Sequence, residues 1–290
     1  MTETWTIARI LTWTQQHFVK KGVESARLDA EVLLAAVLDV NRIYLYTHFD
    51  KPLTTEEREA YKASVKRRAA REPVSQILGK KEFYGVELRV TRDVLTPRPE
   101  TEHLVDAVRD WVRDNAIEAP SIVDIGTGSG AIAIALAKEI PESLLVATDI
   151  SVAALAIAKE NIATHELTER VEILHGDLFA PLEGRDAFDV VVCNPPYIDP
   201  AIREQLDPEV KEYEPAEALF ADDGGRAIIG RLCVEAPTHL RPKGLLAFEI
   251  GHDQRETALA LLGDAGVWDE IKIGRDLQGH SRVVTAFLRS

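Results

Sequence analysis

The spacing of apolar residues divides this chain into a helical first part and a second part that alternates strand with helix. In residues 1–75, apolar side chains recur every three or four positions, which predicts a small helical domain. Residues 76–95 change to the two-residue period of strands and carry turn glycines, which predicts a β-hairpin linker. Residues 96–290 alternate buried-strand and helical patterns, as expected for an α/β domain with a mostly parallel, doubly wound sheet.

Start and stop signals place several of the helices. Thr54-Thr-Glu-Glu57 is a capping box that predicts a helix to about Arg71, and Ser25 is positioned to cap an earlier helix. The basic cluster Lys66-Arg67-Arg68 is more simply explained as a solvated helix face than as a partner-binding surface. Proline fits the first turn of a helix, so Pro99 predicts a further helix, with the core face Leu104, Val105, Val108 and Val112.

The strands expected in the second domain end in residues suited to binding. Their ranges are 122–125, 144–149, 171–174, 190–192, 245–250, 268–273 and 282–288. In an open α/β sheet, ligands bind outside the carboxyl ends of the strands. We therefore expect a ligand-binding site at the residues that end or follow these ranges.

One strand is followed by a rigid corner rich in hydrogen-bond acceptors. The run Val190–Val192 is typical of a buried strand, and it stops at Asn194-Pro195-Pro196, since proline has no N–H for the ladder. Tyr197 adds an aromatic ring. The Asn194 side chain and the Pro195 carbonyl offer acceptors, which suits a planar NH2 group whose hydrogens each need one. For an isolated motif, a simple strand terminator remains the better explanation.

A glycine-rich loop favours a ligand-binding site over a simple strand terminator. Asp124-x-Gly-x-Gly-x-Gly130 follows a predicted strand and opens a helix, so the backbone of Gly126, Thr127, Gly128, Ser129 and Gly130 is open to close approach by a ligand. Asp149 ends the next strand, where a carboxylate can accept from both ribose hydroxyls, and Asp177 ends the third. Asp149 could also be only a helix cap. Together, in sheet order, these residues favour a nucleoside ligand.

Composition narrows the class of protein. The chain has 290 residues with 46% hydrophobic and 28% charged, which is ordinary for a globular protein, and a net charge of −14 that disfavours a broad DNA-binding surface. Its cysteines, Cys193 and Cys233, form neither a disulfide framework nor a zinc spacing. No signal-peptide core or membrane-spanning apolar run occurs, so we expect a cytoplasmic protein.

The loop, the strand-end carboxylates and the Asn-Pro-Pro-Tyr corner resemble the S-adenosylmethionine site of class I methyltransferases that modify planar NH2 nitrogens. Thr96-Pro-Arg-Pro-Glu-Thr-Glu102 and Asp276-Leu-Gln-Gly-His-Ser-Arg282 narrow the resemblance to the bacterial peptide chain release factor glutamine methyltransferases. The chain departs from some members of that family at Leu178, where they carry tryptophan. An apolar contact with adenine is then implied, without aromatic stacking.

The resemblance implies a Rossmann-like domain with a mostly parallel seven-stranded sheet over residues 96–290, preceded by a helical substrate-recognition domain over residues 1–75. It implies methyl transfer from S-adenosyl-L-methionine to the glutamine amide of the Gly-Gly-Gln motif in release factors, by a monomer that binds no nucleic acid and no membrane. The implied catalytic residues are Asn194, Pro195 and Tyr197, and Pro196 joins them in binding substrate. The implied cofactor residues are Gly126, Thr127, Gly128, Ser129, Gly130, Asp149, Asp177, Leu178 and Asn194.

Three alternatives remain at this stage. A methyltransferase for a ribosomal-protein glutamine shares Asn-Pro-Pro-Tyr but is not expected to share Arg98-Pro-Glu-Thr-Glu102. A DNA adenine N6-methyltransferase uses a similar corner, but it flips its base out of a duplex and usually carries a basic recognition region. A non-catalytic S-adenosylmethionine-binding protein would keep the loop and lose the corner.

Overall fold

The computed structural model describes residues 4–290, which form two compact units. The first unit comprises the described residues up to Gly79 together with the short segment Asp207–Tyr213, and the second comprises Lys80–Leu206 and Glu214–Ser290. Within the described part of the chain, no helix is long and apolar enough to cross a membrane.

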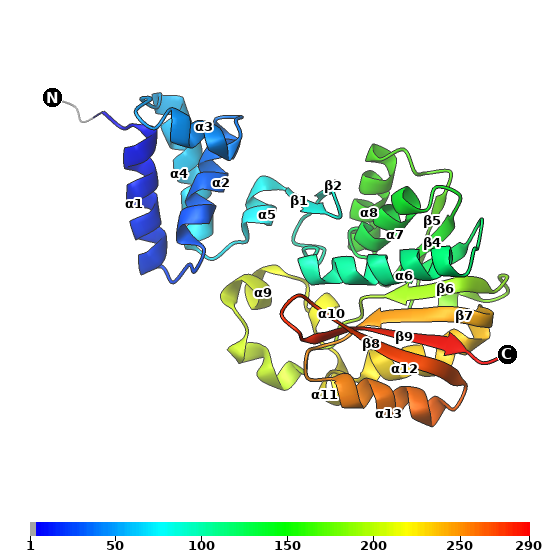
Figure 1. Ribbon diagram of the computed structural model, residues 1–290. Coiled ribbons are helices and arrows are strands. Elements are labelled where there is room, and N and C mark those ends of the chain that lie inside the picture. Colours follow the sequence, from blue (N-terminus) through cyan, green and yellow to red (C-terminus); the bar gives the residue numbers. More distant parts are fainter. Residues whose placement is uncertain (1–3) are drawn as a thin grey trace. The chain divides into compact units, whose positions relative to one another are not determined.

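The first unit is helical, as its apolar spacing predicted, and α1, α2 and α4 lie side by side in it (Figure 1). Phe18, Leu33, Leu34 and Tyr61 are almost fully buried between these helices. The predicted capping box is confirmed, because Thr54 and Glu57 exchange side-chain to backbone hydrogen bonds of 2.7 and 3.1 Å. The helices are α1 (Ile7–Lys20), α2 (Ala26–Val37), α3 (Arg42–Thr47), α4 (Thr55–Ala69), α5 (Val74–Leu78) and α9 (Pro208–Tyr213).

The basic cluster at the end of α4 is largely engaged within its own unit. Arg68 is buried and donates to Asp29 at 2.6 Å and to Glu209 of α9 at 2.9 Å. Arg71 donates to the same Glu209 at 2.5 Å. The expectation of a solvated face is therefore wrong for Arg68, because its charge is desolvated and satisfied by two carboxylates.

Residues 74–78 are a second departure from the sequence expectation. Residues 76–78 were assigned to the strand pattern of the linker, but together with residues 74 and 75 they form the short helix α5, which Gly79 ends with a φ of 73°. The hairpin follows, with β1 (Lys80–Phe83) and β2 (Val86–Arg89) paired antiparallel across Tyr84 and Gly85. A run of five mixed residues cannot by its period alone distinguish a helical turn from a strand.

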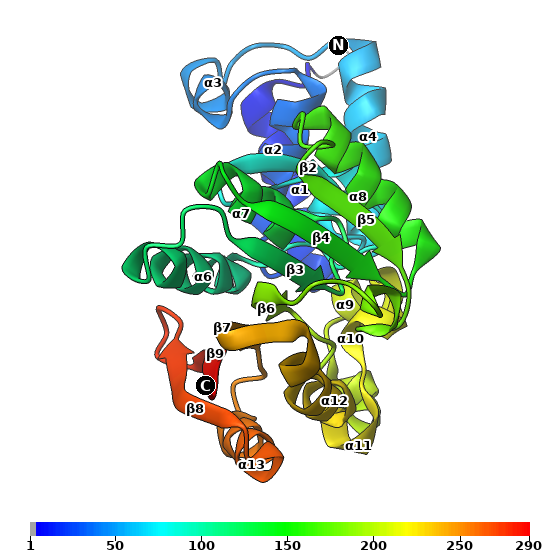
Figure 2. The ribbon, with the colours of Figure 1, turned by 90° about the vertical axis from the view of Figure 1, so that its right-hand side faces the viewer.

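The second unit contains the predicted seven-stranded sheet, in the order β5-β4-β3-β6-β7-β9-β8. All neighbouring pairs are parallel except those made by β9. Figure 2 shows these strands stepping across the unit from β5 to β8. They are β3 (Ser121–Ile125), β4 (Leu144–Asp149), β5 (Val171–His175), β6 (Phe188–Cys193), β7 (Leu240–Glu249), β8 (Trp268–Arg275) and β9 (Ser281–Leu288).

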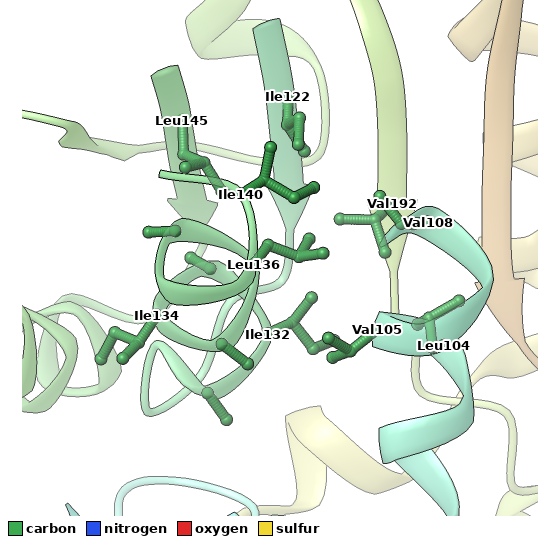
Figure 3. Close-up of a cluster of buried hydrophobic side chains, with 14 of the residues drawn as sticks. Leu104, Val105, Val108, Ile122, Ile132, Ile134, Leu136, Ile140, Leu145 and Val192 are labelled. Carbon is green, nitrogen blue, oxygen red and sulfur yellow. The ribbon is translucent and has the colours of Figure 1, made fainter. Parts of the chain in front are cut away.

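Helices cover both faces of this sheet, because its strands carry apolar residues on both sides. On one face the predicted core residues Leu104, Val105 and Val108 meet Ile132 and Leu136, as Figure 3 shows. On the other face a separate cluster packs around Phe248. The first face is covered by α6 (Glu102–Asp114), α7 (Ala131–Glu139) and α8 (Val152–Thr164), and the second by α12 (Ala227–Glu235) and α13 (Arg255–Ala265).

The beginning of β7 was mispredicted. A strand was expected over residues 245–250, but α12 ends at Glu235, the 3-10 turn Ala236–His239 follows, and β7 already starts at Leu240. Leu240 is buried, but Arg241, Pro242 and Lys243 after it are all exposed, so this segment lacks a strand pattern. Long-range pairing of Leu240 with Phe188 decides the conformation there. The remaining short elements are the 3-10 turns Pro99–Thr101, Ala180–Leu182 and Pro200–Gln205, and the helices α10 (Ala216–Leu219) and α11 (Asp222–Gly225).

Candidate active site

The carboxyl ends of four parallel strands lie beside one cavity in the second unit. β3, β4, β5 and β6 end here, and the cavity has a volume of about 380 Å3. Its lining includes the predicted site residues Gly126, Gly128, Asp149, Asp177, Leu178, Asn194 and Pro196. The other predicted residues adjoin these in sequence without lining the cavity; they are Thr127, Ser129, Gly130, Pro195 and Tyr197.

The glycine loop is held from one side and open on the other. The N–H groups of Gly126 and Thr127 both donate to the Thr148 carbonyl, at 2.8 and 2.9 Å. Gly126 and Gly128 have φ of 71° and 57°, in the left-handed region that favours glycine. A Cβ at either residue would meet no atom within 4 Å, so the loop leaves room for a ligand to approach its backbone.

Asp149, the last residue of β4, is hydrogen-bonded to the glycine loop that follows β3. Its carboxylate accepts from Gly128 N at 2.8 Å and from Ser151 N at 2.9 Å, while Ser151 Oγ accepts from Ala154 N as the cap of α8. Burial raises the pKa of Asp149. Because each carboxylate oxygen can accept more than one hydrogen bond, these contacts leave capacity for hydroxyl donors from the cavity.

The third strand end is more open. Asp177 is half exposed and pairs with Arg231 of α12 at 2.9 Å. Leu178 follows with a φ of 45°, lines the cavity and packs against the cluster around Phe248. The apolar contact predicted for Leu178 is therefore available from the cavity wall.

Asn194 and Pro195 present acceptors at the end of β6. Asn194 Nδ2 donates to Thr101 Oγ1 at 3.1 Å. Within residues 4–290, neither Asn194 Oδ1 nor the Pro195 carbonyl accepts a hydrogen bond from the protein. Cys193 of β6 pairs with Ile125 of β3, so the corner lies beside the start of the glycine loop.

Tyr197 is fixed at both ends. Its hydroxyl donates to Glu249 Oε1 at 3.2 Å, and its carbonyl accepts from Gln254 Nε2 at 2.9 Å. Gly225 lies so close that a Cβ there would be 2.2 Å from the Tyr197 carbonyl oxygen. The chain leaving the corner therefore has little freedom to move.

Two residues of the corner were not predicted from the sequence. Thr101 donates to Glu249 Oε2 at 2.6 Å, and both side chains are buried, with 4% and 2% of the residue exposed. Burial raises the pKa of Glu249, and the hydrogen bonds from Thr101 and Tyr197 and the charge of Arg282 oppose that rise. A glutamate inside the apolar end of β7 was the available signal, because glutamate is almost never fully buried without partners.

Arg98, whose role the sequence left open, pairs with a buried carboxylate. Its guanidinium donates to Glu214 Oε2 at 2.6 Å, and Glu214 Oε1 accepts from Thr96 N at 3.3 Å. Pro215 and Ala218, which follow Glu214, line the cavity. The pair thus anchors this wall of the cavity to the segment that precedes α6.

Cys193 is buried at the end of β6, and burial raises the pKa of its thiol well above the ordinary range. A thiol is nucleophilic as its thiolate. Cys193 is thus a buried strand residue whose environment disfavours the thiolate.

The sheet order, the glycine loop after β3 and the carboxylate after β4 define a class I methyltransferase that uses S-adenosylmethionine. A family model described as "Methyltransferase small domain" matches residues 104–210, and one described as "PrmC N-terminal domain" matches residues 9–79. The release factor glutamine methyltransferases of Rhodopirellula baltica and Geobacter sulfurreducens are each 44% identical over 283 residues, covering 97% of this chain and 96% of theirs. The chain belongs to the release factor glutamine methyltransferase family.

Solved structures support the fold. The hMettl16 catalytic domain, in complex with a MAT2A 3′UTR hairpin, matches with a TM-score of 0.57 at 16% identity, covering 78% of this chain and 81% of that one. A methyltransferase from Pyrococcus furiosus matches with a TM-score of 0.51 at 17% identity, covering 79% of this chain and 98% of that one.

Proposed function

We propose that this protein methylates the side-chain amide nitrogen of the glutamine in the Gly-Gly-Gln motif of peptide chain release factors. The observation that carries the proposal is the pair of unused acceptors at the end of β6, Asn194 Oδ1 and the Pro195 carbonyl. They stand beside the glycine loop at an edge where parallel strands bind ligands. An amide NH2 has two hydrogens, so two fixed acceptors can hold it in one plane.

S-adenosylmethionine supplies a methyl group already activated by its sulfonium. An amide nitrogen is a weak nucleophile, because its lone pair is delocalised into the carbonyl. Asn194 and Pro195 act on this by accepting the two N–H bonds, which become stronger donors as positive charge develops on nitrogen. Tyr197, held by Glu249 and Gln254, packs on the flat amide, and Pro196 stiffens the corner. Most of the catalytic effect is then orientation and preorganised charge.

The cavity fits the cofactor by its donor set. The open backbone of the glycine loop leaves space for the cofactor at Gly126 and Gly128, and Asp149 offers acceptors to ribose hydroxyls. Leu178 provides an apolar wall for the adenine, and Asp177 stands next to it. Thr127, Ser129 and Gly130 act by shaping the loop: Thr127 Oγ1 donates to Asp124, and Asn161 Nδ2 donates to the Ser129 carbonyl.

The helical unit is assigned to recognition of the protein substrate. Large apolar side chains are exposed on and just after α3, among them Ile43 at 71% and Phe49 at 58%. In the full-length protein, Ile43→Asp and Phe49→Ser should raise KM for release factor several-fold while leaving cofactor affinity unchanged. Val234→Asp on α12, also exposed at 67%, is the matched control and should have no effect on KM. Unchanged KM in both test variants would remove this role.

The deciding experiment for the function compares substrates in parallel. Methyl transfer from tritiated S-adenosylmethionine is measured on a release factor, its Gln→Ala variant, ribosomal proteins and duplex DNA. We expect label only in the release factor with its glutamine. Label in a ribosomal protein or in DNA instead would move the assignment to the corresponding rival, and the net charge of −14 already argues against DNA.

A release factor substrate also implies a cytoplasmic site of action and no requirement for bound nucleic acid. We also propose that the active form is a monomer. Light scattering at assay concentration tests the monomer directly.

A further inference from the structure

A chain of hydrogen bonds runs inward from the proposed amide-binding corner to a buried carboxylate. Asn194 Nδ2 donates to Thr101 Oγ1 at 3.1 Å, and Thr101 Oγ1 donates to Glu249 Oε2 at 2.6 Å. Tyr197 donates to the other oxygen of the same carboxylate, at 3.2 Å. Both polar side chains of the corner are therefore tied, directly or through Thr101, to Glu249.

The direction of these hydrogen bonds follows from the chemistry of the groups. When Glu249 is ionised, its carboxylate only accepts, and Thr101 then directs its single hydroxyl hydrogen to it. The Thr101 oxygen then has only lone pairs left for Asn194. It can be satisfied only by the NH2 end of the Asn194 amide, and this places the carbonyl end of that amide on the opposite side.

This direction matters because a side-chain amide has two nearly isosteric orientations. Rotation by half a turn about its last bond exchanges Oδ1 and Nδ2 with little change of shape. With Oδ1 toward the substrate, Asn194 accepts from the target amide. With Nδ2 there instead, two NH2 groups would face each other and one hydrogen of the target would lose its acceptor in a desolvated site.

We propose that Thr101 and Glu249 are positioning residues that lock the orientation of the Asn194 amide, so that Oδ1 faces the target nitrogen. The proposal rests on the function assigned above and adds two residues that do not themselves touch the reacting atoms. Glu249 is suited to this task because it is buried in the last position of β7, the strand paired directly with β6. Its position is therefore set by the sheet rather than by a flexible loop.

The test uses the full-length enzyme with a release factor substrate. Thr101→Val keeps the shape and removes the hydroxyl, so kcat should fall on the order of 10-fold, while the Kd for S-adenosylmethionine stays within about 2-fold, as expected for one lost hydrogen bond. Thr101→Ser restores the hydroxyl and should recover most of kcat. Unchanged kcat in Thr101→Val would overturn the proposal.

A double-mutant cycle separates this role from a general effect on packing. If Thr101 acts through Asn194, adding Thr101→Val to Asn194→Ala should change kcat by less than about 2-fold. A full additional loss in the double variant would mean that Thr101 acts elsewhere, and would overturn the proposal.

Glu249→Gln tests the same proposal independently if Thr101→Val does not fold. The amide can donate to Thr101 as well as accept from it, so Thr101 is free to turn its hydrogen toward Asn194. A loss of kcat that disappears in the Asn194→Ala background supports the lock, and a loss that persists in full in that background overturns it. Absence of methylation by the unmodified enzyme would instead overturn the assigned function.

Discussion

The half of the site that we assign to the cofactor and the half that we assign to the target amide, called below the cofactor half and the target half, are built from different kinds of contact. In the cofactor half, Asp149 binds the N–H groups of Gly128 and Ser151, and Thr127 binds Asp124. These partners are at most 21 positions apart and come from two successive strands and the loops that follow them. In the target half, Asn194, Thr101 and Glu249 come from three distant segments and meet through side chains only.

Each half also contains a buried carboxylate, and the two differ in how they are satisfied. Glu249 accepts a hydrogen bond on each oxygen. Asp124 accepts from Thr127 on Oδ2, but its Oδ1 is buried and, among the described residues, has no partner. The carboxylate of the target half therefore has a partner on each oxygen, whereas the carboxyl group of the cofactor half keeps one buried oxygen without a partner among the described residues.

The largest effect expected from this difference is a pH dependence of stability. Burial raises the pKa of Asp124 to about 7, with the charge of Asp149 adding to the rise and the hydrogen bond from Thr127 opposing it. Between pH 4 and 7 the folded state then holds a proton that the unfolded state has lost. The free energy of unfolding should therefore fall as pH rises through this range, by on the order of 4 kcal/mol.

Asp124→Asn should remove most of that fall, as measured by urea unfolding of both proteins at acidic and mildly alkaline pH. Asp264→Asn, at an exposed position of α13, is the matched control and should leave the pH dependence as it is. If the free energy of unfolding of the Asp124→Asn protein depends on pH as strongly as that of the unmodified protein, both oxygens of Asp124 have hydrogen-bond partners. The contrast with Glu249 then disappears.

Gly225→Ala should destabilise the target half. The new Cβ would overlap the Tyr197 carbonyl at 2.2 Å, and Gly225 has a φ of 80°. Backbone strain and overlap together should lower the free energy of unfolding by about 3 kcal/mol. Gly263→Ala in α13 is the control, since its Cβ meets nothing within 4 Å, and it should stabilise slightly. Equal thermal melting of the two variants would contradict the tight packing around Tyr197.

The contrast between the halves also explains what could be predicted from sequence. Leu104, Val105 and Val108 were assigned correctly to a core face, because helical period is a local property. The glycine loop and Asp149 were likewise found from the order of residues along adjacent strands. Glu249 was missed because nothing within its own segment indicates Thr101, which is 148 positions away.

The other departures have the same origin. In the sequence Arg68 resembles an exposed helix residue. In the structure its buried guanidinium pairs with Asp29 and Glu209, which come from two other segments. The start of β7 lacks a strand pattern because residues 241–243 are exposed, and it pairs with β6 through the buried Leu240. Local signals thus specified the elements and the cofactor loop, while contacts between distant segments completed the site.

Replacing Asn194 tests the target half without touching the cofactor half. Asn194→Ala removes an acceptor and should lower kcat on release factor on the order of 10²-fold, because that hydrogen bond strengthens as nitrogen becomes positive. Asn194→Asp keeps an acceptor and should fall between Asn and Ala. The Kd for S-adenosylmethionine, measured by calorimetry, should change much less than kcat. An alanine variant with normal kcat would reduce the corner to a strand terminator.

Replacing Asp149 is the converse test, with a smaller expected effect. Asp149→Ala should weaken S-adenosylmethionine binding by about 2 kcal/mol, since hydrogen bonds to a charged acceptor contribute about 1.5–3 kcal/mol. Part of any loss could come from the turn into α8, because Asp149 also accepts from Ser151 N. Ser151→Ala controls for this: it removes the cap on Ala154 and should cost about 1 kcal/mol of stability with little change in Kd. If both variants lose affinity equally, Asp149 serves the helix and not the ribose. If only Asp149→Ala loses affinity, its carboxylate holds the cofactor directly, and its two backbone contacts keep it in place for that purpose.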